Sequence, residues 1–309
     1  MSKLNIADLH PIFRQSTQVV YPPFKKGRYL EEYFYDFVST HTFPVQSNIV
    51  YIPAFWTNIQ ISSTFIARIS IYQKLLDDAL SKYPEETQFF TVVQHDDGVM
   101  LKLPTNTILF GSCTGHIPLP LIYEDTDNTL INSVNNIVRR APKYTASFVG
   151  TITHPLRKYM TDHLGNHQDV SIDIQGTWTN QVSDRRAEEF IQNCQDSKYI
   201  LSPRGYGRSS FRYFEAMQLG VVPVYIWDDK EWLPYKEHLD YSKFAISSNI
   251  NEVPNIYNTL KNISDSEYQA FIEEGKKVAP WFTLEGMSRY IISVILATPD
   301  IIRGFTNYP

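Results

Sequence analysis

The chain has 309 residues, of which 43% are hydrophobic and 20% are charged. This composition is typical of a globular protein, and the length suits two domains of roughly 150 residues each. The formal net charge of −5 and the lack of a long basic run in the sequence argue against a general nucleic-acid surface.

The cysteine content and the hydropathy of the sequence indicate a cytoplasmic protein. Cys113 and Cys194 are the two cysteines, too few for a disulfide framework and without the spacing of a metal site. The N-terminal residues lack the apolar core of a signal peptide, and no stretch approaches the ~18 apolar residues of a membrane span. We therefore expect no membrane span.

Strands and helices alternate in the first half of the sequence. The apolar spacing predicts strands over 48–55, 88–94 and 107–110, a helix around 31–34 and a longer helix over 62–81. This alternation favours a parallel sheet, and such sheets bind ligands at the carboxyl ends of their strands.

Three polar residues, His95, Asp96 and Asp97, directly follow the predicted strand 88–94. A carboxylate or an imidazole at such a strand end can act as a general base. We rank Asp96 first and His95 second for this role, and Asp97 is a weaker acceptor-side candidate. The alternative interpretation is that both aspartates cap a turn while His95 bonds to the backbone.

Two weaker signals follow in the sequence. The glycine-bracketed loop over 111–116 ends in His116, a candidate contact for an acceptor substrate. Asp125 and Asp127 follow an apolar run at 121–123 and imitate the Asp-X-Asp pair that holds a divalent ion against a diphosphate. Because more polar residues follow, we interpret this segment as a solvated turn and expect no metal site.

The second half repeats the alternation after an Asn-rich boundary at 128–143. Strands are predicted over 144–151, 170–174 and 244–246, and helices over 184–195, 252–263, 265–278 and 284–296. We expect one domain over 1–140, a second over 141–283, and a terminal helix over 284–309 that crosses back to the first domain.

The stretch from 197 to 226 carries the strongest functional signal. It is typical of a strand, a tight turn at Gly205 and Gly207, a helix that begins near Ser209 or Ser210 and ends near Gly220, and a second strand.

Three arginines surround the start of this helix. Arg204, Arg208 and Arg212 stand near the positive end of the helix dipole, where a cation is disfavoured by ~0.3–1 kcal/mol. Guanidinium groups beside free amides suit a phosphate or a diphosphate. We expect one face of the helix, which carries Arg208, Arg212 and Glu215, to point outward. The alternative interpretation is an ordinary surface helix in which Arg212 and Glu215 form an ion pair.

The run PRGYGRSSFRYFEAMQLGVVPV at 203–224 resembles the nucleotide-sugar site of exostosin-type glycosyltransferases. Ser209 and Phe211 depart from the Asn and Pro usual in that family, and this bears on the contacts to the donor. His95, Asp96 and Gly98 also match a His-Asp element of the family. The matching residues of the run are Arg204, Gly205, Gly207, Ser210, Arg212, Phe214, Glu215, Ala216, Gly220, Pro223 and Val224.

The resemblance implies the GT-B fold, in which two Rossmann-like parallel-sheet α/β domains face each other across a cleft. It also implies an inverting glycosyltransferase that moves a sugar from a nucleotide diphosphate sugar, with a UDP-sugar favoured, to a glycan or other hydroxyl acceptor. No metal or other cofactor is expected. Eukaryotic members usually carry a membrane anchor, so the lack of one in this sequence points to a bacterial or viral setting.

The resemblance also gives expected roles to single residues. Arg204 and Arg212 would stabilise charge on the departing diphosphate, and Glu215 would accept hydrogen bonds from ribose hydroxyls. Further nucleotide-sugar contacts would come from Thr151, Arg157, Gly205, Tyr206, Gly207, Ser209 and Ser210.

Three alternatives stay open at this point. The first is a metal-dependent transferase that uses Asp125 and Asp127. The second is a nucleotide-sugar or carbohydrate-binding module without catalysis, and the third is a sugar-nucleotide epimerase or hydrolase.

Overall fold

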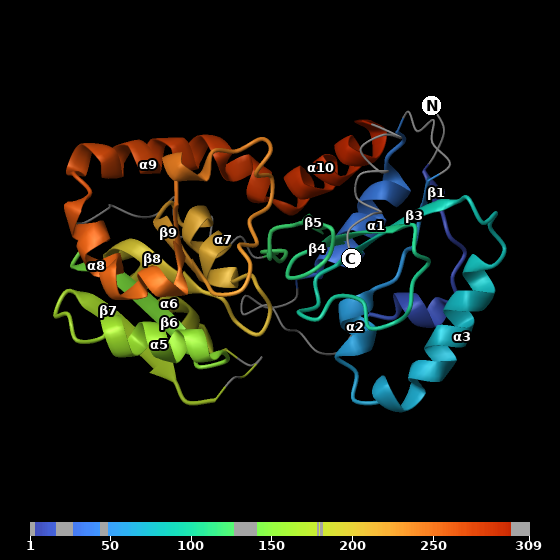
Figure 1. The fold of residues 1–309 in the computed structure, drawn as a ribbon, viewed down its shortest axis with the longest axis horizontal. Helices are drawn as coiled ribbons and strands as arrows, with labels where there is room; N and C mark the ends of the chain where they lie inside the picture. Colours follow the sequence, from blue (N-terminus) through green and yellow to red (C-terminus); the bar gives the residue numbers. More distant parts are fainter. Residues whose placement is uncertain are drawn as a thin grey trace. The chain divides into compact units, whose positions relative to one another are not determined.

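The computed structural model describes residues 4–16, 27–43, 49–126, 141–177, 179 and 182–297. These residues form two compact units (Figure 1). Unit 1 takes in the described residues within 4–16, 28–119 and 283–297, and unit 2 those at 27 and within 120–282. Each unit contains a parallel sheet with helices, so the prediction of two parallel-sheet α/β domains is confirmed. Their predicted arrangement across a cleft stays a prediction.

The sheet of unit 1 has the strand order β1-β2-β3-β4-β5, and all of its strand pairs are parallel. Its strands are β1 (Asn5–Ile6), β2 (Ile49–Tyr51), β3 (Gln88–Val93), β4 (Thr107–Gly111) and β5 (Ile117–Pro118). Its α-helices are α1 (Leu30–Thr40), α2 (Trp56–Gln60), α3 (Ile69–Leu80) and α10 (Leu284–Ala297), and short 3-10 turns lie at Pro11–Arg14 and Ile66–Arg68.

Alternate side chains of β3 pack on opposite faces of the unit 1 sheet. Phe89 lies in a core cluster with Leu76 of α3. Phe90, on the other face, stacks on Tyr51 of β2 and meets Phe34 of α1 edge to face. Helix α10 contacts α1, so the last described helix belongs to unit 1.

The sheet of unit 2 has the order β10-β9-β8-β6-β7, again with parallel pairs. Its strands are β6 (Tyr144–Thr151), β7 (Val170–Gln175), β8 (Ser197–Pro203), β9 (Val222–Trp227) and β10 (Ile246–Asn249). Its α-helices are α5 (Pro155–Leu164), α6 (Asp184–Gln195), α7 (Phe211–Gln218), α8 (Val253–Asn262) and α9 (Asp265–Val278), with 3-10 turns at Tyr241–Lys243, Ile250–Glu252 and Ala279–Phe282.

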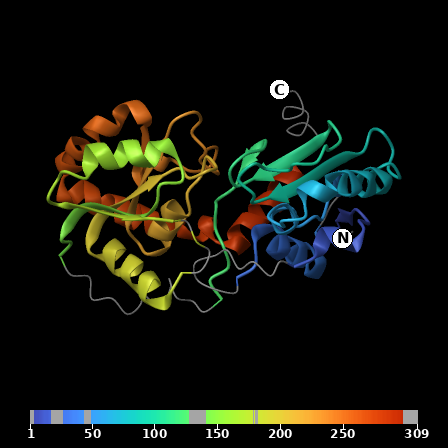
Figure 2. The same cartoon turned by 90° about the horizontal axis from the view of Figure 1, so that it is seen from below.

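Helices cover both faces of the unit 2 sheet (Figure 2). One face packs against α5, α8 and α9, and the other packs against α6 and α7. The chain runs from β6 outward to β7 and then returns to the other side of β6 as β8. This reversal creates a topological switch point between β6 and β8, the place where open α/β sheets bind their ligands.

Most of the predicted elements agree with the structure, and the exceptions have local causes. The strand predicted at 144–151 and the helices at 184–195 and 265–278 have the observed bounds. The helix predicted from 62 begins only at Ile69, because Ser62 and Thr64 bond to each other and form a turn. The short helix α2 was not predicted, and residues 121–123 are buried without strand pairing.

Two predictions about chain organisation fall partly outside the described residues. The boundary expected at 128–143 and its division at 140 lie mostly within 127–140, which the structure does not describe. The described residues 120–126 group with unit 2. Among the described helices, none is long and apolar enough to cross a membrane.

Candidate functional site

The predicted turn and helix after β8 are confirmed in unit 2. Ser210 is the N-cap of α7, which begins at Phe211, and Gly220 follows the helix with a φ of 66°, a left-handed conformation that favours glycine. A Cβ on Gly205 would lie 3.1 Å from Arg157 Nη2 and 3.5 Å from Thr153 Oγ1. Glycine therefore lets the turn approach the loop after β6 closely.

Arg157 links the ends of β6 and β8. Its guanidinium donates to the carbonyls of Thr151 at 2.9 Å, Arg204 at 3.0 Å and Pro203 at 3.4 Å. These bonds hold the loops on both sides of the switch point in one arrangement. The predicted contact of Arg157 with a diphosphate stays a prediction. The structure shows that Arg157 bonds to the backbone at the ends of β6 and β8.

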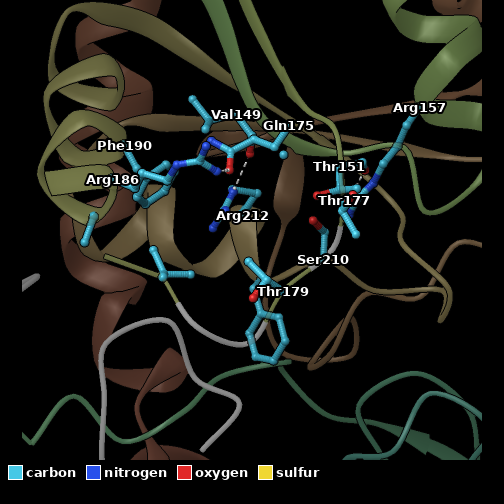
Figure 3. Close-up of a pocket in the computed structure, with 14 residues that line it drawn as sticks. Val149, Thr151, Arg157, Gln175, Thr177, Thr179, Arg186, Phe190, Ser210 and Arg212 are labelled. Atoms are coloured by element: carbon cyan, nitrogen blue, oxygen red, sulfur yellow. Dashed lines mark hydrogen bonds between the residues drawn. The ribbon is translucent and has the colours of Figure 1, made fainter. Parts of the chain in front are cut away.

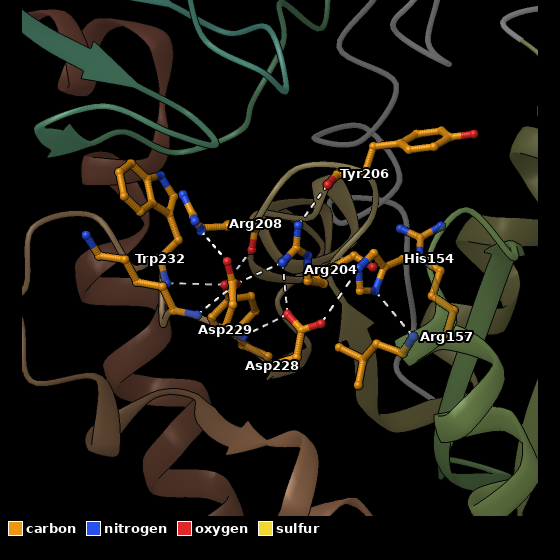
Figure 4. Close-up of polar contacts among 11 residues, drawn as sticks. His154, Arg157, Arg204, Tyr206, Arg208, Asp228, Asp229 and Trp232 are labelled. Atoms are coloured by element: carbon orange, nitrogen blue, oxygen red, sulfur yellow. Dashed lines mark hydrogen bonds and ion pairs between the residues drawn. The ribbon is translucent and has the colours of Figure 1, made fainter.

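Arg204 is paired within the protein, and its side chain is 11% exposed. Its Nη1 donates to Asp228 Oδ1 at 2.9 Å and to Asp229 Oδ1 at 2.8 Å, and Nη2 donates to the carbonyl of Tyr206 at 2.8 Å. Arg208 Nε donates to the second oxygen of Asp229 at 2.7 Å. Two guanidinium groups and two carboxylates thus form a network that is neutral overall (Figure 4).

His154 lies at the edge of this network. It is the N-cap of α5, where its Nδ1 accepts the amide hydrogen of Leu156 at 3.3 Å. Its Nε2 lies 3.7 Å from Asp228 Oδ2. Burial, together with the charge of Arg204, lowers the pKa of His154. Because Nδ1 accepts the Leu156 amide hydrogen, the neutral ring carries its proton on Nε2, which faces Asp228.

Glu215 points inward, and the prediction that it faces outward is wrong. It is 2% exposed, and its two oxygens accept from Tyr123 Oη at 2.8 Å and from Arg212 Nη1. Arg212 Nε also donates to the carbonyl of Val149 at 2.8 Å, and its guanidinium lies over the ring of Phe190. The ion pair considered as an alternative is therefore present, and Glu215 holds Arg212 in place.

A cavity of ≈ 150 Å³ opens at the carboxyl ends of β6 and β7, beside the starts of α6 and α7 (Figure 3). Its charged lining residues are Arg157, Arg186 and Arg212, and no carboxylate is among its described lining residues. The hydroxyl groups around it belong to Thr151, Thr177, Thr179 and Ser210. The cavity is therefore cationic and rich in hydrogen-bond donors, which suits an anion.

Three buried polar atoms near the glycine turn have no hydrogen-bond partner among the described residues. They are Thr153 Oγ1, Arg204 Nε and Ser210 Oγ. Buried polar groups are nearly always satisfied, so such a group calls for an explanation in water, an ion or a ligand. Their grouping favours this edge of unit 2 as a binding site.

The remaining predicted residues of the turn differ in exposure. Tyr206 is 67% exposed, whereas Ser209 is 4% exposed and Gly207 is buried. Tyr206 is thus free to lie against a ligand, and Ser209 contributes to the packing of the turn.

Sequence reasoning missed the part of the cavity that follows β7. Arg186 Nη1 donates to Gln175 Oε1 at the end of that strand, and both residues line the cavity. The strand at 170–174 was predicted, and polar residues follow it. The rule that ligands bind at carboxyl ends of parallel strands would have identified them.

In unit 1, the predicted cluster after β3 forms a turn. His95 Nδ1 accepts the amide hydrogen of Asp97 at 3.2 Å, and the His95 carbonyl accepts that of Gly98 at 2.9 Å. Burial lowers the pKa of His95. Asp96 and Asp97 are exposed, and Cys113 Sγ lies 3.4 Å from Asp96 Oδ1. The turn and the exposed carboxylates agree with both interpretations of this cluster.

A buried glutamate supports this turn and was missed by sequence reasoning. Glu31 of α1 is 0% exposed, and its Oε1 accepts from Thr57 N at 3.2 Å, Thr57 Oγ1 at 2.7 Å and Gln94 N at 2.9 Å. Burial raises the pKa of Glu31, although these bonds oppose the rise. No local sequence signal distinguishes Glu31 from an ordinary exposed helix residue.

The weaker candidates are not gathered into a metal site in the described part of the chain. His116 Nδ1 accepts the amide hydrogen of Leu109 at 2.9 Å, and burial lowers the pKa of His116. Asp125 is partly buried, and Asp127 lies outside the described residues. Among the residues described, no three His, Cys, Asp or Glu side chains group as a metal site would require.

The part of the chain that contains the unit 2 site matches a known protein domain. The exostosin GT47 domain matches residues 112–263, close to half of the chain and most of unit 2. This range contains Thr151, Arg157, Arg204 and Arg212, and the cluster at 95–97 lies before it.

Individual relatives are similar to short parts of the chain. Two sequences from Arabidopsis thaliana, each called "Probable glycosyltransferase", are 30% identical over 90 residues and 24% identical over 151 residues. These matches cover 29% and 47% of this chain but 19% and 26% of the relatives. Exostosin-1b of Danio rerio is 26% identical over 115 residues, which are 37% of this chain and 15% of that protein. The chain thus spans about a quarter or less of these relatives.

Solved structures give a distant likeness. TarM aligns with a TM-score of 0.35 and 9% identity, covering 70% of this chain and 56% of TarM. WaaG, a glycosyltransferase involved in lipopolysaccharide biosynthesis, aligns with a TM-score of 0.34 and 9% identity, covering 81% and 75%. Residues 112–263 therefore match the exostosin GT47 domain, and this part of the chain is similar to exostosin-like glycosyltransferases.

Proposed function

We propose that this chain is a glycosyltransferase that moves a sugar from a nucleotide diphosphate sugar to a hydroxyl of a glycan or similar acceptor. The observation that carries the proposal is the cavity lined by Arg157, Arg186 and Arg212 with no carboxylate among its described lining residues. It lies beside the switch point, at the carboxyl ends of β6 and β7 within the matched exostosin domain, where an anionic ligand is expected.

The donor would bind to unit 2 through its anionic part. Ligand pockets for whole small molecules measure about 300–1,000 Å³, so a cavity of ≈ 150 Å³ suits one portion of the donor, such as the diphosphate. Arg212, the hydroxyls of Thr151 and Ser210, and the amides at the start of α7 supply donors for it. Tyr206 is exposed enough to lie against the nucleotide. A UDP-sugar is the favoured donor.

The reaction is proposed to be a direct displacement with inversion. The acceptor oxygen attacks the anomeric carbon, the bond from that carbon to the diphosphate breaks, and the acceptor proton passes to a base. Asp96 of unit 1 is the first candidate for the base and His95 the second. Positive charge from arginines and helix amides would stabilise the departing diphosphate, so the transfer is proposed to need no metal.

A ligand screen followed by a transfer assay tests the proposal. UDP, GDP, dTDP and CMP and their sugars are added singly, and a ligand that binds the folded state raises the melting temperature. The ligand that does so is then incubated with candidate glycan acceptors, with and without EDTA, and released nucleotide is measured. We expect UDP to bind and transfer to survive EDTA.

Other outcomes would change the proposal in defined ways. Binding without transfer to any acceptor would indicate a binding module. Activity that EDTA abolishes and manganese restores would indicate a metal-dependent transferase, and turnover without an acceptor would indicate an epimerase or hydrolase. If no nucleotide or nucleotide sugar binds, the donor site itself is disproved.

A further inference from the structure

Five arginines near the carboxyl ends of the unit 2 strands fall into two groups by their position relative to the cavity. Arg157, Arg186 and Arg212 line the cavity, and no carboxylate lines it in the described residues. Arg204 and Arg208 lie outside it and are matched by two carboxylates of their own. The loop after β8 thus presents little net positive charge, although its sequence contains two arginines.

The two carboxylates differ in exposure and in the bonds that they accept. Asp228 is 24% exposed, and its Oδ1 accepts from Arg204 Nη1 and from the amide hydrogen of Asp229 at 2.9 Å, while Oδ2 faces His154. Asp229 is 44% exposed, and its oxygens accept from the two guanidinium groups and from the amide hydrogen of Lys230. Asp229 bonds to both guanidinium groups and is also the more exposed carboxylate, so it is the one that a ligand can reach more easily.

A diphosphate needs the same donors that Asp229 now uses. Carboxylate and phosphate oxygens both accept charge-assisted bonds from guanidinium groups with similar geometry. Arg204 Nη1 has two hydrogens, and both already point to carboxylates. An anion that binds to Arg204 Nη1 and Arg208 Nε therefore has to displace Asp229.

We propose that Asp229 is an internal competitor of the diphosphate: it occupies the donors of Arg204 and Arg208 in the free protein and yields them when the ligand binds. The inference rests on the proposed function for the identity of the anion. Asp229 then weakens the binding of the nucleoside diphosphate, which carries more negative charge than the nucleotide sugar, and promotes release of this product.

Asp229→Asn tests the inference, because a competitor and a positioning residue predict opposite changes in ligand affinity. In the natural protein, Asp229 Oδ1 accepts the amide hydrogen of Lys230 at 2.7 Å. The asparagine keeps an Oδ1 that can accept this bond, but it loses the charge that competes for the arginines. Isothermal titration calorimetry should show UDP and inorganic pyrophosphate binding about tenfold tighter, with steady-state turnover reduced where product release limits it. A residue that only positions the arginines would give weaker binding after the same change.

Asp162→Asn is the matched control. Asp162 pairs with Lys158 on the exposed side of α5, so its change alters the net charge equally without touching Arg204 or Arg208. It should leave UDP affinity within about twofold. The melting temperature of each variant verifies that it is folded.

The outcomes separate this inference from the proposed function. UDP binding that is unchanged or weaker in Asp229→Asn overturns the inference while the donor site stands. Tighter pyrophosphate binding without binding of any nucleotide supports the inference and disproves the nucleotide donor. If pyrophosphate binds neither the natural protein nor the variant, the competitor role is disproved as well.

Discussion

Two buried glutamates, one in each unit, differ in the groups that donate hydrogen bonds to them. Glu31 in unit 1 accepts hydrogen bonds from neutral donors of Thr57 and Gln94. Glu215 in unit 2 accepts from Tyr123 and from the guanidinium of Arg212. A carboxyl buried among neutral groups favours its protonated form, and Glu31 is in that situation, whereas Glu215 has the charge of Arg212 directly beside it.

The carboxyl ends of the strands in the two sheets also differ in the charged groups that surround them. The end of β3 is followed by a histidine and two carboxylates, groups that can exchange protons. The ends of β6 and β8 are surrounded by arginines, groups that stay charged and bind anions. Two units of one architecture therefore differ in chemistry, and this supports assigning the base to unit 1 and the donor to unit 2.

The largest expected effect lies at the candidate base. Asp96→Asn should lower sugar transfer by about 10²–10⁴-fold, the usual contribution of a general base, and leave UDP affinity unchanged. Transfer rates and calorimetry measure the two effects separately. Weakened UDP binding would contradict the division of chemistry between the units.

The neighbouring carboxylate provides the control for this substitution. Asp97→Asn keeps the amide hydrogen that bonds to His95, so the turn should form as before. Normal transfer is expected for it. If Asp97→Asn alone abolishes transfer, the base is Asp97, and if neither substitution matters, His95 becomes the first candidate.

The next largest expected effect is a loss of stability when the ion pair between Arg212 and Glu215 is broken. Glu215→Ala leaves the charge of Arg212 without its partner and Tyr123 Oη without its acceptor. Breaking a buried pair in this way costs about 3 kcal/mol or more in the free energy of unfolding. Urea denaturation followed by fluorescence measures it.

An exposed pair in the same unit gives the comparison. Glu189 and Arg185 form an ion pair on the surface of α6, and Glu189→Ala should leave the unfolding midpoint nearly unchanged. Equal midpoints for Glu189→Ala and Glu215→Ala would mean that the Arg212 to Glu215 pair contributes nothing through its burial.

The sequence predicted the framework of this site better than its internal pairing. Buried parallel strands are continuous apolar runs, and the strand at 144–151 was therefore recognisable with its full bounds. The start of α7 at Phe211 and its end before Gly220 also follow from local turn chemistry. These features depend on residues close together in the chain.

The inward position of Glu215 could not be predicted because its cause is distant in the sequence. Tyr123, which lies 92 residues earlier, supplies one of its two hydrogen bonds. The same holds for Glu31, whose partner Gln94 lies 63 residues away. Helical spacing alone places Glu215 beside Arg212 on a polar face, and only the tertiary fold decides whether that face is covered.

The smallest expected effect is a pH dependence of the free energy of unfolding that arises from Glu31. Burial raises the pKa of Glu31 above its ordinary value of 4.5, so the folded state binds the proton more tightly than the unfolded state. The resulting stability is fully present below the unfolded pKa and is lost as the pH rises through the folded pKa. Glu31→Gln mimics the protonated form, since its Oε1 can accept the same three bonds.

Urea unfolding of both proteins between pH 4 and pH 8 measures this difference. We expect the two free energies of unfolding to be close at the acidic end and the natural protein to become progressively less stable than Glu31→Gln as the pH rises. Because all other titrating groups are shared, the difference between the curves isolates Glu31. A difference that does not vary with pH would mean that burial does not raise the pKa of Glu31.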